Sequence, residues 1–538
     1  MTIWNVIMIL CLAGSCLLAA RGLIHSFQLE SYQFQGYFRT IRRNLLKAIL
    51  PGVILNGVYL VAGVLLILAI PESNEWLAPT LLSLIVLGCG WLLNRKARKV
   101  PAKKALVITS RVKRLAACMM AVMTGLLILF SCLGGGDGIG NRICRGLVLL
   151  FPALLPLWTA AGAALAAPME AGIRTLYFRD AQRILRERPD LIKIGITGSW
   201  GKTSVKFILG TMLQEKYNTL VTPGSFNTPM GVTKVIRGSL EPGHRVFVAE
   251  MGARHVGEIK ELCRLVSPEM GILTSVGPQH LDTFRTLERV ISTKYELVEA
   301  IPADGMCFFA DDGGLVRELY DRTEKPKRLA GIDPEKDDVW AENLRTGPEG
   351  SRFDLVIGGK RIACQTALLG QLNIRNIVLC AAVCAQMGLS EEQIRRGIEK
   401  LKPISHRLEL IPRPGLYTVI DDAFNSNIVG AEQAFLTLKE FPGRRIVVTP
   451  GMVELGNEEE AMNTAFGEKM APCCDLAILI GKKRSEAIRK GLEKQGFPKE
   501  KILVMGSLQE AADWIGREAG SGDVILFEND LPDNYDES

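Results

Sequence analysis

Five apolar runs in the first third of the chain constrain its fold most strongly. Each run is close to the ~20 residues that a helix needs to cross the hydrocarbon core of a membrane. The runs extend over residues 3–20, 49–70, 76–93, 115–133 and 147–167. We therefore expect residues 1–170 to form an α-helical membrane domain of about five transmembrane helices. This fits the 48% share of hydrophobic residues in the whole chain.

Charge predicts the orientation of this domain. Residues 1–170 hold 16 Lys+Arg against 5 Asp+Glu, so the net charge of +7 divides into +11 there and −4 in the remainder. Nine of the basic residues lie between the third and fourth runs, whereas segment 71–75 has two acids and no base. Because Lys and Arg remain on the cytoplasmic side of a membrane, we expect the chain after the last run to lie in the cytoplasm. Its acidic balance gives no indication of a nucleic-acid partner.

Two other features of the sequence have simple interpretations. Residues 1–20 lack the basic segment and the cleavage site of a signal peptide, so we expect the first run to be retained. The 13 cysteines are scattered, with no C-x-x-C pair and no His at zinc-finger spacing. They indicate small buried residues in a reducing compartment.

A glycine turn between a short strand and a helix follows the last apolar run. Residues 191–196 form an apolar β-type run, the chain turns through Gly198 and Gly201, and an amphipathic helix begins near Lys202. In such a turn, backbone N–H groups and the helix N-terminus bind phosphate oxygens. Lys202 can reach the β- and γ-phosphates of a nucleotide, and the hydroxyl group of Thr203 can bind Mg²⁺.

These residues, with Ser204, predict an ATP site even though the strict G-x-x-x-x-G-K-[ST] pattern is not met. That pattern requires Gly at position 196, where this chain has Ile196. The match instead runs as G-x-x-G-x-x-G-K-T from Gly195. The order of strand, turn and helix supports the prediction, because it is the context in which such a turn binds phosphate.

Two later strand ends also carry polar residues. The apolar run that ends at Glu250 has the placement of a magnesium-binding carboxylate beside a phosphate-binding turn. A second run ends at His280 and Asp282, and a helix with Lys294 follows. A single His at a strand end is more often a structural hydrogen-bonding residue than a ligand. Since ligands of open α/β sheets bind at the carboxyl ends of strands, the neighbouring strand ends favour a ligand role for His280.

The sequence over residues 190–485 resembles the Mur ligases, enzymes that join an amino acid or peptide to a growing cell-wall peptide. Within this family it is most similar to the branch that adds D-alanyl-D-alanine to UDP-N-acetylmuramoyl-tripeptide. The motifs that carry the resemblance occur in the family's order and approximate spacing: "GITGSWGKTSVK", "TPGSFNTPMGV", "VAEMGARHVGEI", "HLDTF…STKYELVEAI", "GQLNIRNI", "HRLELI", "DDAFNSN" and "GRRIVVTPGMVELG".

The resemblance implies an ATP-dependent amide ligase. Members of the family transfer the γ-phosphoryl group of ATP to the carboxylate of the growing peptide, and an incoming amine then displaces phosphate from the acyl phosphate. Both steps build negative charge, so we expect metal ions and cationic side chains more than acid–base groups. The implied partners are ATP, Mg²⁺, a muropeptide-type acceptor and an amino acid or dipeptide amine, at a bacterial cell membrane.

The resemblance also assigns metal ligands. It implies that Thr203 and Glu250 hold one Mg²⁺, and that His280 with a carbamylated Lys294 holds or positions a second. Without the resemblance, Lys294 would be assigned to the solvated face of an amphipathic helix, because charged residues surround it at 288, 289 and 296.

Further contacts with nucleotide and acceptor are implied in the same way. Lys202 and Arg407 would contact the transferring phosphoryl group, and Asp422 the ribose. Asn373 and Asn376 would contact the adenine side of the nucleotide, and Asn227 and Thr228 would contact the phosphate or the acceptor.

The chain departs from the family pattern at several positions. The early domain that holds the UDP-sugar is missing. The histidine that usually precedes the first adenine-side Asn is Leu372, "GDM" is "PGM" at Pro450–Met452, and "NANP" is "NSNI" at Asn425–Ile428. The tail also lacks the usual glycine and basic residues. The prediction of an ATP site stands despite these departures, which mainly concern the sugar side and the incoming-amine pocket.

Other functions remain as alternatives. The acceptor could be a lipid-linked muropeptide or a poly-glutamate chain. A membrane domain before a nucleotide-binding domain also suggests a half-transporter, but "LSEEQ" at Leu389–Gln393 is better interpreted as a helix cap at Ser390 than as a transporter signature. A membrane scaffold with a degenerate ligase domain is disfavoured, because Lys202, Thr203, Glu250, His280 and Lys294 are all present.

The sequence thus predicts an α-helical membrane bundle followed by two α/β domains. The bundle is expected at 1–170, a central ATP-binding domain at 185–400, and a C-terminal Rossmann-like domain at 401–538. The buried strands of the last domain are expected in "RRIVVTP", "LAILIG" and "DVILF". We expect ATP to lie between the two α/β domains, with domain closure bringing Arg407 and Asp422 to it.

Overall fold

The computed structural model describes residues 3–30, 32–71, 74, 76–99, 105–135, 138–413, 415–424, 427–453, 455 and 458–530. The chain divides into two compact units, Met1–Thr175 and Leu176–Ser538.

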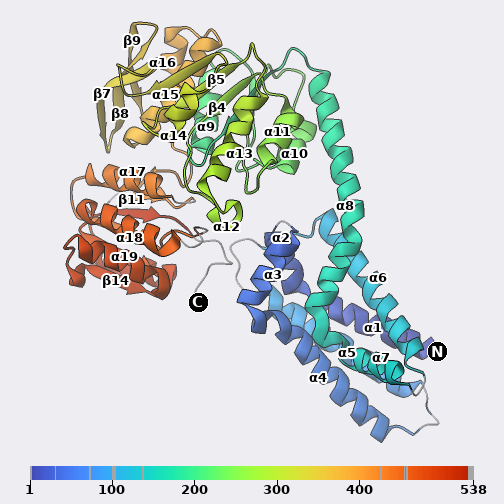
Figure 1. Ribbon diagram of the computed structural model, residues 1–538. Coiled ribbons are helices and arrows are strands. Elements are labelled where there is room, and N and C mark those ends of the chain that lie inside the picture. The colour runs from blue at the N-terminus through green and yellow to red at the C-terminus, as the bar shows by residue number, and fades with distance from the viewer. Residues whose placement is uncertain are drawn as a thin grey trace. The chain divides into compact units, whose positions relative to one another are not determined.

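The first unit is built from helices (Figure 1), and the long ones are apolar. The helices are α1 (Ile3–Ala19), α2 (Arg21–Leu29), α3 (Phe34–Arg43), α4 (Leu45–Ala69), α5 (Leu77–Arg98), α6 (Ser110–Leu133), α7 (Ile139–Leu149), the short η2 (Phe151–Leu154) and α8 (Leu155–Arg186), which continues into the second unit. Four helices, over Leu45–Ala69, Leu77–Arg98, Ser110–Leu133 and Phe151–Arg186, are long and apolar enough to cross a membrane. The number rises to five if α1 and α2, bent by 48°, form one span.

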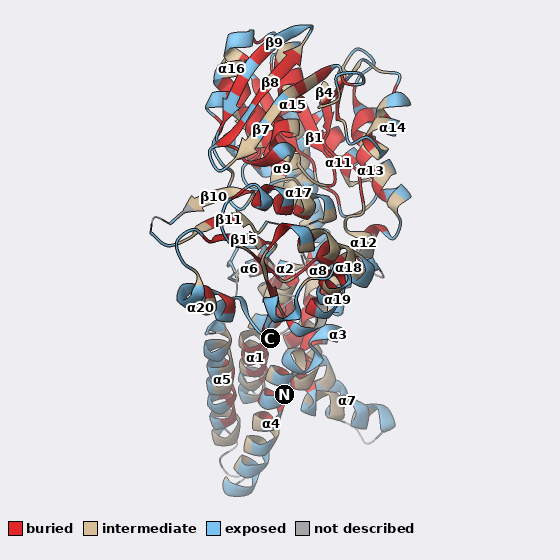
Figure 2. Ribbon diagram, turned by 90° about the vertical axis from the view of Figure 1, so that its left-hand side faces the viewer, coloured by how far each residue is buried: buried red, intermediate tan, exposed pale blue. Residues whose placement is uncertain are grey.

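In α4, α5 and α6 only a small part of the apolar segment is buried, 22% of the residues in each, whereas the share is 44% in Phe151–Arg186. In α6 the buried residues Leu115, Met119, Met123 and Leu127 recur every four positions, so they lie on one face. Large apolar side chains elsewhere remain exposed, including Ile67 and Leu68 of α4. Figure 2 shows α4 coloured largely as exposed and intermediate. Such an apolar exterior fits a multi-pass membrane anchor. The orientation in the membrane and the number of spans stay predictions.

The second unit begins with a nine-stranded sheet in the order β2-β3-β1-β4-β5-β6-β7-β8-β9. Neighbouring strands are parallel from β2 to β7, and β8 and β9 extend the sheet in antiparallel fashion. The strands are β1 (Ile192–Thr197), β2 (Thr219–Val221), β3 (Val246–Glu250), β4 (Met270–Leu273), β5 (Met306–Ala310), β6 (Lys327–Gly331), β7 (Val339–Gly347), β8 (Gly350–Ile357) and β9 (Lys360–Thr366).

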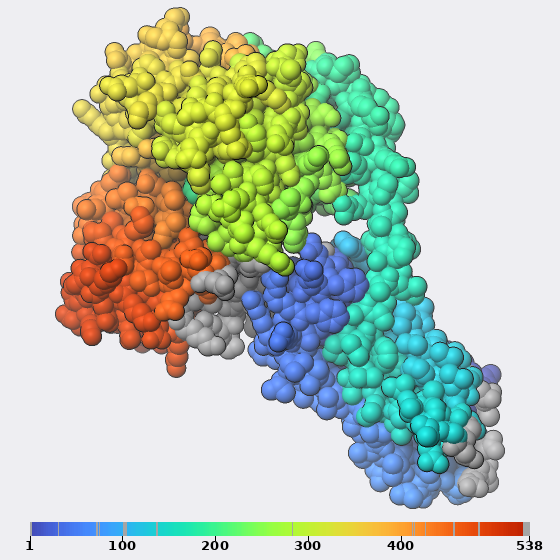
Figure 3. Space-filling view, in the orientation of Figure 1, coloured from blue at the N-terminus to red at the C-terminus, as the bar shows by residue number. Residues whose placement is uncertain are grey.

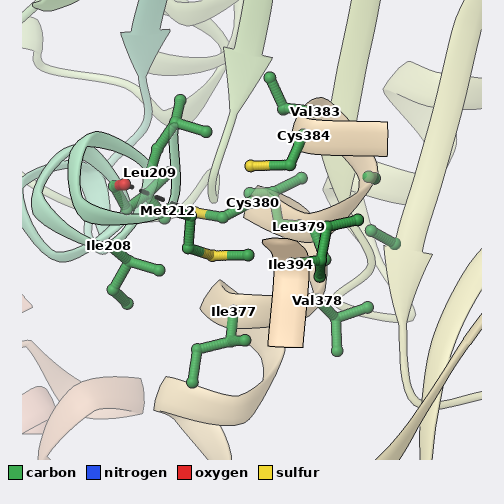
Figure 4. Close-up of a cluster of buried hydrophobic side chains, with 14 of the residues drawn as sticks. Ile208, Leu209, Met212, Ile377, Val378, Leu379, Cys380, Val383, Cys384 and Ile394 are labelled. Atoms are coloured by element: carbon green, nitrogen blue, oxygen red, sulfur yellow. Dashed lines mark hydrogen bonds between the residues drawn. The ribbon is translucent and has the colours of Figure 1, made fainter. Parts of the chain in front are cut away.

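Helices cover both faces of this sheet and bury two hydrophobic cores. One core holds α9 (Lys202–Leu213), α15 (Gly370–Gln386) and α16 (Glu391–Glu399), where Met212, Cys380 and Ile394 come together (Figure 4). The other holds α10 (Pro229–Ser239), α11 (Glu258–Val266), α13 (Leu287–Ala300) and α14 (Leu315–Asp321). The strands between them are buried on both faces, as parallel sheets usually are.

The last part of the chain forms a six-stranded sheet in the order β10-β11-β15-β12-β13-β14, parallel except for β10. Its elements are β10 (Glu409–Pro412), β11 (Thr418–Asp422), α17 (Ile428–Lys439), β12 (Arg445–Thr449), α18 (Glu459–Met470), β13 (Leu476–Ile480), α19 (Lys482–Lys494), β14 (Ile502–Met505), α20 (Leu508–Glu518) and β15 (Val524–Glu528). This layer lies directly against the nine-stranded layer (Figure 3). A hydrogen bond from Thr346 to Glu440 joins them.

The predicted fold class is confirmed. The three expected buried strands are β12, β13 and β15, and Ser390 caps α16 in a complete capping box with Gln393. The limits of the three predicted domains stay predictions.

Candidate active site

The predicted phosphate-binding turn joins β1 to α9. The strand ends at Thr197, and the helix begins at Lys202. The two intervening glycines have φ angles of 152° at Gly198 and 81° at Gly201, a region that side chains disfavour. A Cβ atom at Gly198 would also overlap the Thr274 side chain, so glycine is required here by both conformation and space.

The segment after β4 braces this turn. The Ser275 hydroxyl accepts a hydrogen bond from the Trp200 N–H (2.7 Å), and Ser199 Oγ donates to the Gly277 carbonyl (3.0 Å). The Thr274 hydroxyl donates to the Trp200 carbonyl (2.5 Å). Because β4 is the direct neighbour of β1, these bonds fix the turn on one side.

Glu250 lies on the other side of the turn, at the end of β3. Its register partner in β1 is Ile196, and its side chain is almost fully buried. Oε1 accepts hydrogen bonds from the Thr203 hydroxyl (3.1 Å) and the Asn227 amide (2.9 Å). Oε2 accepts one from the Lys206 ammonium group (2.9 Å). Three segments that are separate in the sequence therefore meet at one carboxylate.

The charge balance of this site is positive. Burial opposes ionisation of Glu250, but Lys206, Lys202 and Asn227 outweigh it and lower its pKa. Burial lowers the pKa of Lys202 to about 8, with Glu250 acting in the opposite sense and Arg407 in the same sense. The Lys202 ammonium group donates to the carbonyls of Gly198 (2.5 Å) and Ser199 (2.8 Å) of its own turn. The site is thus suited to a polyanionic ligand.

The residues around Thr203 fit a magnesium ion. The Thr203 hydroxyl and Glu250 Oε1 are hard oxygen donors that already lie 3.1 Å apart. Within the described part of the chain, no group of three or more His, Cys, Asp or Glu side chains could hold a metal ion together. Few protein ligands are typical of Mg²⁺, which usually keeps several waters and also binds substrate phosphates.

Lys294 is buried on α13 and does not lie on a solvated helix face. The interpretation that follows from its charged neighbours in the sequence is therefore wrong, because these neighbours lie on other faces of the helix. Burial, together with the charge of Lys202, lowers the pKa of Lys294 well below its usual value, although Glu258 and Glu296 act in the opposite sense. His280 follows β4 in a left-handed conformation (φ 53°) and precedes the short helix α12 (Leu281–Phe284).

The residues expected on the nucleotide side come from α15 and from the start of the second sheet. A Cβ atom at Gly201 would lie 3.5 Å from the Asn376 Oδ1 atom, so Asn376 borders the glycine turn. The Asn373 amide donates to the Leu369 carbonyl (2.9 Å) at the start of the same helix. Asp422 is the last residue of β11.

Arg407 and Asp422 are electrostatically linked to each other. Burial lowers the pKa of Arg407, while Glu250 and Asp422 act in the opposite sense. Burial raises the pKa of Asp422 to about 6, although it accepts a hydrogen bond from the Leu408 N–H (3.1 Å). The Arg407 guanidinium group also lies over the Phe424 ring, 4.7 Å from its centroid.

The other predicted residues have structural contacts. Ser204 is buried in the first turn of α9. The Thr228 hydroxyl accepts a hydrogen bond from the Gly231 N–H (3.2 Å) and caps α10. Sequence reasoning missed Lys206 and the hydrogen bonds by which Thr274 and Ser275 hold the glycine turn. Lys206 could have been found from its spacing, since it follows Lys202 by four residues on one helix face.

The fold and the site together define a nucleotide-binding α/β protein of the phosphate-loop class. The chain matches two domain families: the Mur ligase middle domain over residues 196–384, and the Mur ligase, glutamate ligase domain over residues 406–528. The long apolar helices of the first unit occupy the chain before these matches.

Individual proteins are also similar. The chain is 30% identical over 317 residues to the UDP-N-acetylmuramoyl-tripeptide--D-alanyl-D-alanine ligase of Escherichia coli (strain K12), which covers 58% of this chain and 69% of that protein. The enzyme of the same name from Bacillus subtilis (strain 168) is 26% identical over 336 residues, or 62% and 72% of the two chains. The chain therefore belongs to the Mur ligase family, whose members are ATP-dependent acid–amino-acid ligases.

Solved structures show the same fold. MurF from Acinetobacter baumannii has a TM-score of 0.59 at 24% identity, over 66% of this chain and 77% of that one. MurF from Thermotoga maritima, in complex with ADP, has a TM-score of 0.59 at 23% identity, over 66% and 80%.

Proposed function

We propose that this protein forms an amide bond in a cell-wall precursor, most similar to the addition of D-alanyl-D-alanine to UDP-N-acetylmuramoyl-tripeptide. The observation that carries the proposal is the meeting of Lys202, Thr203 and Glu250 at adjacent strand ends of a Mur ligase fold. The similar enzymes from Escherichia coli and Bacillus subtilis carry that reaction in their names.

In the proposed reaction, a carboxylate oxygen of the acceptor attacks the γ-phosphorus of ATP and ADP leaves. The amine nitrogen then attacks the acyl carbon, phosphate leaves, and the amine loses a proton. Lys202 and Arg407 would stabilise the charge on the transferring phosphoryl group. Asn373 and Asn376 would orient the adenine, Asp422 the ribose, and Asn227 with Thr228 the phosphate or acceptor.

Thr203 and Glu250 would hold Mg²⁺, which supplies charge neutralisation at the phosphates when bound. Lys294, as a carbamate, and His280 would hold or position a second ion. The buried position of Lys294 and its lowered pKa support this role, because a neutral amine is the form that reacts with carbon dioxide.

For the first unit we propose a multi-pass anchor in the cell membrane, with the catalytic domains in the cytoplasm. It would hold the catalytic site at the inner membrane face, where a lipid-linked precursor is accessible. Tethering raises the effective concentration of a membrane-bound acceptor. Alternatively, the unit is only an anchor and the acceptor is a soluble UDP-linked peptide.

ADP release by the purified full-length protein tests this function. The assay compares UDP-linked and lipid-linked muropeptides as acceptors, each with candidate amines, in the presence and absence of Mg²⁺. We expect ADP release only when acceptor, amine and Mg²⁺ are all present. Release that is independent of both acceptor and amine would contradict the proposal.

A further inference from the structure

Lys206 is a buried cation one helical turn beyond Thr203. Its side chain is fully buried on α9. The ammonium group donates to Glu250 Oε2 (2.9 Å) and to the Gly224 carbonyl (2.5 Å). It therefore joins three elements: the helix that follows the glycine turn, the end of β3, and the loop that carries Asn227. The reaction proposed above assigns no role to this lysine.

The two oxygens of Glu250 have different environments. Oε1 accepts from two neutral groups, the Thr203 hydroxyl (3.1 Å) and the Asn227 amide (2.9 Å). Both can turn toward other partners at low cost. Oε2 accepts from the Lys206 ammonium group, which is charged and enclosed. Removing this charged donor would leave Oε2 of a buried carboxylate without its cationic partner, which is costly. Oε1 is thus the oxygen that can become available to a cation.

This difference determines how Glu250 can bind a metal ion. A carboxylate with one oxygen occupied can supply only the other, and one-oxygen coordination suits the small octahedral shell of Mg²⁺. A carboxylate with two free oxygens can chelate the larger Ca²⁺, which accepts bidentate carboxylates and higher coordination numbers.

We propose that Lys206 is a positioning residue that restricts Glu250 to one-oxygen metal coordination and thereby makes the nucleotide site selective for Mg²⁺ over Ca²⁺. This inference rests on the proposed Mg²⁺–ATP function. The Gly224 hydrogen bond gives the arrangement a second anchor, because it fixes Lys206 to a backbone atom that does not depend on the metal.

The test measures cation selectivity and not activity. Binding of a fluorescent ADP analogue to the full-length protein in nanodiscs is titrated with Mg²⁺ and, separately, with Ca²⁺, for the wild type and for Lys206→Met. Both ions carry the same charge, so the loss of a nearby cation changes the affinities for Mg²⁺ and Ca²⁺ by the same factor. This electrostatic effect therefore cancels in the ratio of the two affinities. The loss of a residue that orients a metal ligand typically changes metal affinity about tenfold or more. We expect the Mg²⁺/Ca²⁺ affinity ratio to fall by about tenfold in Lys206→Met.

Two further variants separate geometry from general effects. Lys206→Gln keeps an N–H donor for Oε2 without the charge, so it should retain most of the wild-type ratio. Lys216→Met is the matched control, since the Lys216 ammonium group also donates to two backbone carbonyls, those of Met387 (3.3 Å) and Gly388 (2.6 Å). It should leave the ratio unchanged.

Each outcome decides a separate question. A folded Lys206→Met protein with a ratio within twofold of wild type would overturn the inference. If Lys206→Met does not fold, the wild type decides: equal affinities of its ADP complex for Mg²⁺ and Ca²⁺ would also overturn it. If the wild type binds no nucleotide with either ion, the proposed function itself fails.

Discussion

The side chains of the proposed active site depend on a few buried charges. Lys202, Lys206 and Arg407 all act electrostatically on the environment of Glu250, the acid that Lys206 pairs with directly. The excess of cationic side chains produces a positive electrostatic potential at the ends of β1 and β3. A bound nucleotide brings the negative charge that this arrangement lacks.

Lys202→Ala and Glu250→Ala should each lower kcat by about 100-fold or more, because each removes one charge partner of the transition state. ADP release under saturating ATP and Mg²⁺ measures the loss. Lys216→Ala, on the surface of the same domain, serves as the control and should keep wild-type turnover. Wild-type turnover in either site variant would refute the assignment of these residues.

Lys294 should carry a carbamate in the active protein. Its burial lowers its pKa and favours the neutral amine, which is the form that reacts with carbon dioxide. Exposure to low pH should remove the carbamate and the activity, and bicarbonate should restore both, as followed by NMR with isotopically labelled bicarbonate. Lys294→Arg should be inactive and unlabelled. Labelling that is absent from active wild-type protein would contradict this expectation.

Nucleotide affinity should depend on the ionisation of Asp422. Since burial raises the pKa of this carboxyl to about 6, it is protonated below that pH and ionised above it. The ionised form is the stronger acceptor for ribose hydroxyl groups, so affinity should increase as the pH rises through about 6. A fluorescent-nucleotide titration over this range measures the effect. Asp422→Asn should remove the step, and a step of equal size in that variant would assign it to another group.

At the scale of elements, the glycine turn is held by its neighbours as much as by its own sequence. The Thr274–Ser275 segment after β4 receives and donates bonds to Ser199 and Trp200, while Glu250 holds the helix side through Thr203. These contacts within the protein hold the turn in place, and a preorganised turn loses less entropy on binding.

Gly198→Ala should damage this turn. The added Cβ atom would overlap the Thr274 hydroxyl, and the φ of 152° disfavours a side chain. We expect a loss of about 1–3 kcal/mol in the free energy of unfolding of this layer, the usual cost of overpacking, together with weaker ADP binding. Denaturant unfolding and nucleotide titration measure the two effects. Gly238→Ala is the control, because open space surrounds that glycine. Equal stability of the two variants would count against a tightly braced turn.

Local sequence patterns predicted the limits of several helices and strands well. They could not predict which strands that are distant in the sequence pair with one another. The sequence places the start of α9 at Lys202 and the end of β3 at Glu250, because glycine, apolar alternation and the first charged residue are local signals. The order of nine strands depends on contacts between distant segments, which no local pattern contains. The burial of Lys294 could not be inferred from its charged sequence neighbours, because it depends on how α13 packs against segments that are distant in the chain.

At the scale of the whole molecule, a unit that contains long apolar helices precedes the ligase unit. The first takes the position in the chain at which the similar MurF proteins have a different N-terminal domain. Under the proposed function, we expect the acceptor to be captured through the membrane or through the ligase unit itself.

A protein that begins at Leu176 distinguishes these two possibilities. If the membrane unit presents a lipid-linked acceptor, the shortened protein should keep its kcat/KM for a soluble UDP-muropeptide but lose at least tenfold on the lipid-linked form in vesicles, where tethering no longer raises the effective concentration. Circular dichroism checks that the ligase unit is folded. Equal kcat/KM on both acceptors, with no gain when the membrane unit is restored, would reject the presentation hypothesis.

The antiparallel extension of the large sheet also has a kinetic consequence. Strands β7, β8 and β9 follow one another directly in the chain and pair as a meander, whereas β1 pairs with β3 and β4 across long intervening segments. Pairing of such distant strands requires the closure of long loops, which slows folding. The meander can therefore form its hydrogen bonds before the parallel strands have paired. We therefore expect the last strands of this sheet to be synthesised to form its earliest ordered edge, and the candidate nucleotide site on β1, β3 and β4 to form late in folding.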